Sequence, residues 1–442
     1  MNNLAAYFAR VLTRWIPDAL TVAVLLTLLV LGLAVGFTES TPMDVATYWG
    51  DGIWNLLTFT MQISLTFLFG FVFANTPIMR ATFEKITRLI NNASSAYIVA
   101  VLTSAICSLF SWALGLVAAG LIARIIGEAC QKKGIKVHYP LLAAAGMSGI
   151  VVWHQGLTGT VGLTIATPGH FLENQIGIIN FADTVLTWWN GAIVLAVLVS
   201  LPFFMARLHP HRDDDISEAP SSFEDVEVSE TNPHERTPAE RLDDSRILVL
   251  LVVGLIGVAL WIHFFNRGLG VELNILNLFF LAAGLLCAGS LGKFIAIVSS
   301  SGRIIAPIIL QYPFYAGIAG VMGNSGLADV IASQFVAIAT AETLPFFAFL
   351  CAGMVNIFVP SGGGQWVVQG PIMMSAATQL GADIPRTAMA VAVGDQWTNL
   401  IQPLIMLPVL TISGLKMREM AGYCLMAALW VGAIFGLAML LL

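Results

Sequence analysis

The residues best suited to chemistry lie in one stretch, 353–371, which reads Gly-Met-Val-Asn-Ile-Phe-Val-Pro-Ser-Gly-Gly-Gly-Gln-Trp-Val-Val-Gln-Gly-Pro. An apolar run stops at Pro360 and resumes at Trp366. Three consecutive glycines leave backbone N–H groups uncovered, and a helix starting at about Gln365 would aim more of them, with its positive dipole end, at the same place. The stretch therefore predicts a site for a small anion, formed by Ser361, Gly362, Gly363, Gly364, Gln365 and Trp366, with Asn356 just upstream.

A second polar group surrounds Asp395, in Gly-Asp-Gln-Trp-Thr-Asn. An ionisable residue inside an apolar run is a functional-site hypothesis by default. Three roles are open for Asp395: it carries a proton, helps to bind Na⁺, or forms a structural pair with a nearby basic group. Pro403 frees carbonyls that could coordinate a cation. We expect ion or proton coupling at Asp395, Thr398, Asn399 and Gln402.

The first half of the chain offers a counterpart, His154-Gln155-Gly156-Leu157-Thr158-Gly159-Thr160. His154 could titrate near neutral pH or make a fixed hydrogen bond, and both interpretations stay open. Trp366 and Phe358 offer an apolar wall for a short acyl chain, although aromatic residues in membranes also serve packing. Close helix packing is likewise the alternative explanation of the glycines. The further candidates for substrate binding are His154, Thr158, Ser111 and Gly115.

Composition indicates the setting of these residues. The 442 residues are 57% hydrophobic and 10% charged, whereas a soluble domain carries about 25% charged residues. The sequence thus predicts an all-α polytopic integral membrane protein. The five cysteines are scattered without a CxxC pair, so we predict neither a disulfide nor a metal site. HExxH, GxxxxGK[ST] and G-x-S-x-G motifs are absent from the sequence, which argues against hydrolysis and ATP-driven pumping.

Apolar runs in the first half predict membrane spans at 19–37, 57–73 and 189–205. A run over 97–126 breaks near 111–115 and has basic residues on both sides, which favours a re-entrant hairpin. Another run starts at Pro140 and is interrupted over 154–159, which is typical of a broken membrane helix.

The most hydrophilic segment, 207–246, divides the chain into a first membrane repeat, 1–206, and a second, 247–442. Arginines near the membrane ends place the N-terminus and this linker in the cytoplasm. Lys293 and Arg303 predict a cytoplasmic turn between spans 273–290 and 304–322.

The halves match at an offset of about 245 residues. Tyr139-Pro140 corresponds to Ile384-Pro385, and the break at His154 to one at Asn399 within a span interrupted over 394–403. Ser111 to Gly120 falls against Asn356 to Gln365 in this alignment. Counting crossings from the basic residues indicates two inverted repeats, each with a re-entrant hairpin and an interrupted helix. Paired interrupted segments in inverted halves point to a transporter's midplane site.

With these residues in view, the sequence resembles the bacterial short-chain fatty acid transporter family over nearly the whole chain. The resemblance is carried by Arg14-Trp-Ile-Pro-Asp, Tyr48-Trp-Gly-Asp-Gly-Ile-Trp-Asn-Leu-Leu, Gln311-Tyr-Pro-Phe-Tyr-Ala-Gly-Ile, Val359-Pro-Ser-Gly-Gly-Gly-Gln-Trp-Val-Val-Gln-Gly-Pro and Gly381-Ala-Asp. It implies uptake of short-chain acids such as butyrate or acetoacetate across the bacterial inner membrane. Through similarity to a wider ion transporter superfamily, it also implies homodimers and an elevator-type motion.

We therefore expect a secondary transporter for a small monocarboxylate, coupled to H⁺ or Na⁺, with the lipid bilayer as its surroundings and with neither an organic cofactor nor nucleic acid involved. The alternative substrates are a dicarboxylate or an amino acid, but 353–371 and 394–403 hold no Lys or Arg for a second carboxylate. An intramembrane acyl transferase using Ser361 or His154 is the alternative of another class.

Overall fold

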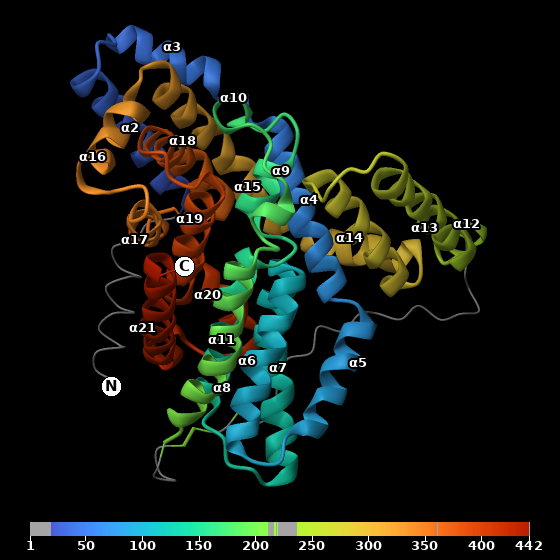
Figure 1. Ribbon diagram of the computed structural model, residues 1–442. Helices are drawn as coiled ribbons and strands as arrows, with labels where there is room; N and C mark the ends of the chain where they lie inside the picture. Colours follow the sequence, from blue (N-terminus) through green and yellow to red (C-terminus); the bar gives the residue numbers. More distant parts are fainter. Residues whose placement is uncertain (1–18, 211–215, 218, 220–236, 360, 442) are drawn as a thin grey trace.

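The computed structural model describes residues 19–210, 216–217, 219, 237–359 and 361–441 (Figure 1). Helices make up 82% of it, and the described part contains no strand. Eight of the described helices are long and apolar enough to cross a membrane, and α14 with the start of α15, bent by 113°, forms a ninth candidate. The prediction of an all-α polytopic membrane protein is confirmed.

The first half forms a series of helices joined by short breaks. These are α2 (Ala19–Phe37), α3 (Pro42–Gly52), α4 (Leu57–Ala74), α5 (Pro77–Ile86), η1 (Thr87–Leu89), α6 (Ala93–Phe110), α7 (Trp112–Lys133), α8 (Tyr139–Gly149), η2 (Ile150–Gln155), α9 (Thr160–Ala166), α10 (Glu173–Ile176), η3 (Phe181–Asp183) and α11 (Trp188–Arg207).

The second half begins with a short polar helix and ends in a long apolar helix. Its elements are α12 (Pro238–Asp243), α13 (Arg246–Trp261), the π-helix η6 (Ile262–Asn266), α14 (Leu273–Ala288), α15 (Leu291–Asn324), α16 (Leu327–Ile338), α17 (Leu344–Asn356), α18 (Gly362–Leu380), α19 (Ile384–Thr398), η7 (Asn399–Ile401), α20 (Pro403–Ser413) and α21 (Met417–Leu441).

Two helix pairs turn back at a serine, one in each half. Ser111 separates α6 from α7, and its side chain caps α7 by accepting a hydrogen bond from the Leu114 N–H at 3.5 Å. Ser361 caps α18 in the same way, accepting from the Gly364 N–H at 3.3 Å. Ser111 and Ser361 thus hold the same capping position in their helix pairs, whereas the sequence alignment set Ser111 against Asn356.

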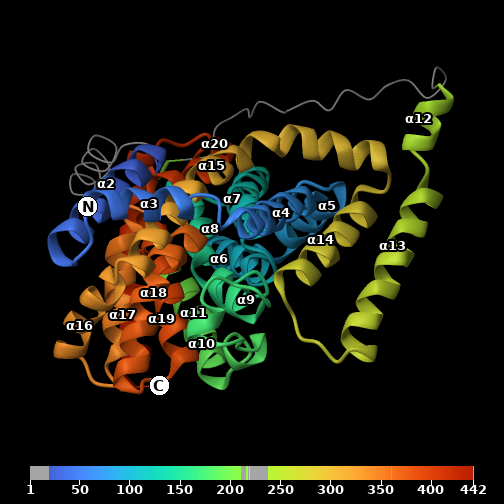
Figure 2. The ribbon, with the colours of Figure 1, turned by 90° about the horizontal axis from the view of Figure 1, so that it is seen from above.

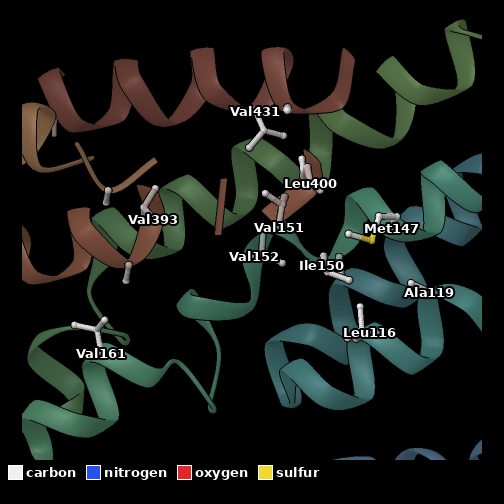
Figure 3. Packing of buried hydrophobic residues seen from close by; sticks show 14 of the residues in the cluster. Leu116, Ala119, Met147, Ile150, Val151, Val152, Val161, Val393, Leu400 and Val431 are labelled. Carbon is white, nitrogen blue, oxygen red and sulfur yellow. The ribbon is translucent and has the colours of Figure 1, made fainter. Parts of the chain in front are cut away.

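Each half also contains the predicted interrupted helix. α8 runs into η2 and stops at Gly156 before α9, and α19 runs into η7 and stops at Gln402 before α20. Their 3₁₀-helical ends meet in the core, where Val151 and Val152 of η2 lie near Leu400 of η7 (Figure 3). The inverted relation of the two halves stays a prediction.

Two boundaries differ from those expected. A turn was predicted between spans 273–290 and 304–322, but residues 291–303 are not a turn, because α15 is helical from Leu291 onward. The chain turns instead at Gly289, whose φ of +80° suits glycine, and Ser290 then caps α15 by accepting from the Lys293 N–H at 3.2 Å. The second difference is that α18 begins at Gly362, three residues earlier than expected, since Ser361 supplies its cap.

The helices divide into a packed bundle and an outlying arm. α13 stands apart from the bundle with α14 between them, and only 17% of its apolar window is buried (Figures 1 and 2). Within the bundle, α4 packs against α7 and α15, and α15 packs against α18. The first hairpin turn therefore lies close to α4, and the second lies close to both α15 and α4. The proposed domain boundaries stay predictions, because most of 207–246 lies outside the described residues.

Candidate substrate and ion site

A histidine and a carboxylate from different halves of the chain meet at the centre of the protein. His154 lies on η2 and Asp395 on α19, and Nε2 of the imidazole is 3.0 Å from Oδ2 of the carboxylate. The two side chains are 0% and 2% exposed. A carboxylate this deeply buried stays ionised only with a partner that offsets its lost hydration, and the His154 imidazole is the nearest side chain that Asp395 Oδ2 meets.

The next residues along each segment form a second cross-link. Gln396 Nε2 donates to Gln155 Oε1 at 2.7 Å, and the His154 N–H donates to Gln396 Oε1 at 2.9 Å. Thus His154 pairs with Asp395 and Gln155 with Gln396. In both pairs the two residues are separated by the same number of positions along the chain. Gln396 was missed as a site residue, although an amide beside an acid in an apolar run was a visible signal.

Asn356, at the end of α17, ties the predicted ion-coupling residues together. Its Nδ2 lies 2.8 Å from the Asp395 carbonyl, 2.9 Å from Thr398 Oγ1 and 2.8 Å from Asn399 Oδ1. Gln402 Nε2 donates to the Asn356 carbonyl at 2.5 Å. All four predicted coupling residues therefore surround one buried amide.

The turn formed by Ser361–Gly364, called the glycine turn below, contacts His154 of the His154–Asp395 pair. A β-carbon added to Gly362 would lie 2.9 Å from His154 Nε2 and 2.9 Å from the Trp153 ring. The N–H groups of a helix's first turn have no intrahelical acceptors, and the positive end of the α18 dipole lies at the same place. An anion held at this turn would therefore lie close to the buried acid.

Two tyrosines of α15 cover the other glycines. A β-carbon on Gly363 would collide with the Tyr312 hydroxyl, and one on Gly364 would lie 2.5 Å from the Tyr315 ring. Tyr312 OH is 3.4 Å from Ser361 Oγ. Sequence reasoning missed both tyrosines as site residues, although Gln311-Tyr-Pro-Phe-Tyr places an amide and a proline in an apolar span. The glycines thus serve close packing as well as exposing their backbone.

The remaining candidates of the second hairpin are buried or turned away. Gln365 Nε2 donates to the Ala352 carbonyl at 2.9 Å and to Gln369 Oε1 at 3.0 Å, which ties α18 to α17. Trp366 is fully buried, whereas Phe358 is 56% exposed. Neither ring lies openly over the glycine turn as an acyl wall would.

The candidates of the first hairpin gather around Trp112. Thr158 Oγ1 accepts from the Trp112 N–H at 2.9 Å, and the Trp112 ring lies 5.8 Å from that of Trp153, next to His154. Ser111 packs against Gly70 of α4, and Gly115 packs against Ser108 of its own hairpin. Ser111 and Gly115 therefore shape the hairpin tip, which reaches the His154–Asp395 pair through aromatic rings.

Unpaired polar atoms concentrate at this centre. Among the described residues, twelve buried side-chain polar atoms have no hydrogen-bond partner, and nine of these belong to the residues just described or their immediate neighbours. Burying such atoms unpaired is costly, so their concentration makes this region the candidate site for a polar ligand. The nine are His154 Nδ1, Gln155 Nε2, Tyr315 OH, Asn356 Oδ1, Gln365 Oε1, Trp366 Nε1, Gln369 Nε2, Asp395 Oδ1 and Gln402 Oε1.

Comparison with known proteins assigns the chain to a protein family. The family model described as "Short chain fatty acid transporter" matches residues 1–442. The chain belongs to this family. A protein of Escherichia coli (strain K12), provisionally named a short-chain fatty acid transporter, is 35% identical over 98% of both chains, and one of Haemophilus influenzae with the same name is 32% identical over 98% of both. Because this is a family of transporters, the chain is not an enzyme.

Solved structures of more distant proteins share the fold. The YdaH transporter of Alcanivorax borkumensis, described as having an unusual topology, matches with a TM-score of 0.60 at 14% identity, covering 96% of this chain and 98% of its own. MtrF of Neisseria gonorrhoeae, described in connection with antimetabolite efflux pumps, matches with a TM-score of 0.58 at 15% identity, covering 98% and 97%. At these identities the likeness concerns the fold alone.

Proposed function

We propose that this protein is a secondary transporter that takes up short-chain fatty acids, such as butyrate or acetoacetate, across the bacterial inner membrane together with a proton. The observation that carries the proposal is the contact between the Ser361–Gly364 turn and the His154–Asp395 pair. The substrate carboxylate binds at the start of α18, and the proton resides on the pair.

The charges explain why the two bind together. A carboxylate at the turn lies beside Asp395, and two negative charges at close range in a low dielectric repel each other strongly. A proton on His154 offsets one of those charges without the loss of a hydrogen bond. Binding of the acid anion and binding of the proton therefore favour each other, which is the requirement for symport.

Na⁺ is the alternative coupling ion, and it is favoured by a specific observation. Asn356 Oδ1, Asp395 Oδ1 and Gln402 Oε1 are buried oxygens without partners, and hard cations prefer oxygen ligands. A sodium ion bound to Asp395 would supply the positive charge that the proton supplies in the proposal above.

The proposed cycle is an elevator-type motion, in which the hairpins and broken helices move against α4 and α15. We also propose a homodimer, and a cytoplasmic location for the N-terminus and the 207–246 linker. The orientation rests on the distribution of Lys and Arg, and the motion and the dimer rest on the family resemblance. A larger anion, such as a dicarboxylate or an amino acid, is the alternative substrate.

The test is initial uptake of labelled acetoacetate and butyrate into proteoliposomes, with a pH gradient and a Na⁺ gradient imposed separately. Protein-free liposomes are subtracted throughout, because the neutral acids cross lipid unaided. We expect the inward proton gradient to accelerate uptake. In Asp395→Asn, we expect this acceleration to disappear while exchange of labelled for unlabelled acid continues.

The other outcomes are equally informative. Acceleration by the Na⁺ gradient alone would replace the proton by Na⁺ in the proposal. An unchanged pH dependence in Asp395→Asn would remove Asp395 from coupling. If neither acid moves faster than in protein-free liposomes, the proposed substrates are wrong and larger anions should be tried.

A further inference from the structure

Aromatic side chains from separate elements cover the glycine turn. Tyr312 comes from α15, Phe59 from α4, and Phe171 from the loop after α9. The Phe59 ring lies 5.8 Å from the Tyr312 ring and 5.8 Å from the Phe171 ring. Tyr312 and Phe59 are buried, and Phe171 is half-buried. The three rings thus form a continuous row that starts at the turn.

The tyrosine end of this row is polar and faces the turn. The Tyr312 hydroxyl lies 3.4 Å from Ser361 Oγ, and it occupies the space beside Gly363 that a β-carbon would fill. Next to it, the fully buried Tyr315 hydroxyl has no partner, and its ring lies over Gly364. A carboxylate at this turn would bring acceptors to both hydroxyls.

The phenylalanine end of the row is apolar and closely packed. A β-carbon on Gly363 would lie 3.5 Å from Phe59 Cζ, which is ordinary van der Waals contact. Phe171 then stands edge-on to Phe59 with an interplanar angle of 62°. An acyl chain leaving the turn along this row would meet Phe59 first and Phe171 next, so that each added methylene requires these rings to give way.

We propose that Tyr312 is a ligand of the substrate carboxylate and that Phe59 and Phe171 set the length of the acyl chain that the site accepts. This inference rests on the proposed function, since it places a short monocarboxylate at the Ser361–Gly364 turn. It assigns recognition of the carboxylate and selection by chain length to different side chains, which can be tested separately.

The experiment measures KM for labelled acetoacetate, and the inhibition constants of acetate, butyrate, hexanoate and octanoate against its uptake. Competition avoids the passive flux of the longer acids. For Tyr312→Phe we expect KM and all four inhibition constants to rise by about tenfold, because a hydrogen bond to a charged group is lost. The matched control is Tyr48→Phe on α3, outside the site.

For Phe59→Leu and Phe171→Leu we expect the ratio of hexanoate to butyrate affinity to rise by about tenfold, because two further methylenes become buried. A general folding defect would lower the amount of active protein and leave this ratio unchanged. If Phe59→Leu does not purify as a single species, Phe171→Leu carries the test, since its side chain is half-buried.

The inference would be overturned by kinetics of Tyr312→Phe equal to those of Tyr48→Phe, or by an unchanged chain-length profile in the purified phenylalanine variants. If the unaltered protein transports acetoacetate and none of the four acids competes, the row of aromatic rings does not select substrates by acyl-chain length. Absence of acetoacetate and butyrate uptake by the unaltered protein would instead refute the proposed function itself.

Discussion

Removing the charge of Asp395 should restore stability to a protein that has lost His154. The structure leads to this expectation because the two side chains are buried together and His154 Nε2 approaches Asp395 Oδ2 to 3.0 Å. If Asp395 is ionised, His154→Asn leaves that buried carboxylate without its imidazole partner. In His154→Asn/Asp395→Asn, no charge remains to be buried. The second substitution should therefore stabilise the first.

The size of the effect follows from the burial. Removing one member of a buried ion pair costs about 3–5 kcal/mol, and the only other side-chain donor that Asp395 Oδ2 meets among the described residues is Asn399 Nδ2, at 3.4 Å. Leaving one neutral buried group without its hydrogen bond costs about 1–3 kcal/mol. The double variant should thus be more stable than His154→Asn by roughly 2 kcal/mol, the difference between these two costs.

The assay is the midpoint temperature of monodisperse protein after heating, measured by fluorescence-detected size exclusion in one detergent. The neighbouring pair Gln155–Gln396, joined at 2.7 Å but uncharged, provides a matched cycle. There, Gln155→Ala and Gln396→Ala should give a double variant no more stable than either single variant. If His154→Asn/Asp395→Asn melts no higher than His154→Asn, the pair does not hold an ionised carboxylate, and the charge argument for symport loses its basis.

Two further predictions concern the turn itself. Gly363→Val should abolish uptake without loss of membrane expression, because its β-carbon would collide with the Tyr312 hydroxyl. The control is Gly36→Val, where an added β-carbon would meet no other part of the structure within 4 Å. Normal uptake by Gly363→Val would exclude the turn from the site. Ser361→Ala should lower stability by about 1 kcal/mol through loss of the α18 cap, whereas Ser361→Thr should retain it. Equal melting of the Ala and Thr variants would show that the cap contributes nothing.

Much of the architecture could be predicted from the sequence because membrane spans are read from continuous apolar runs. The span expected at 19–37 is α2, and the break expected near Ser111 is the tip of the first hairpin. The turn at Gly289 was misplaced because the positions of Lys293 and Arg303 indicate a side of the membrane and not a helix boundary. Local capping by Ser290 decided that boundary.

Only some of the site residues, and none of their contacts, could be predicted from the sequence. His154 and Asp395 could each be singled out as polar residues in apolar runs, but their contact joins segments far apart in the chain. No local pattern states which residue of one half meets which of the other. Tyr312 and Phe59 were harder to find, since an aromatic residue within an apolar span looks like ordinary packing until the glycine opposite it is known.

The distribution of these contacts also separates the roles within the site. The hydrogen bonds of Asp395, Asn356 and Gln402 described above stay within the broken helices and the second hairpin. By contrast, the elements α4 and α15 meet the Ser361–Gly364 turn chiefly through aromatic rings and the Tyr312 hydroxyl. Polar networks bind ions strongly but resist sliding, whereas aromatic surfaces over glycines can separate without leaving charges unpaired. In the proposed elevator cycle, the proposed ion site would therefore lie in the part that moves, and the proposed contacts with the acyl chain would lie mainly in the part that stays.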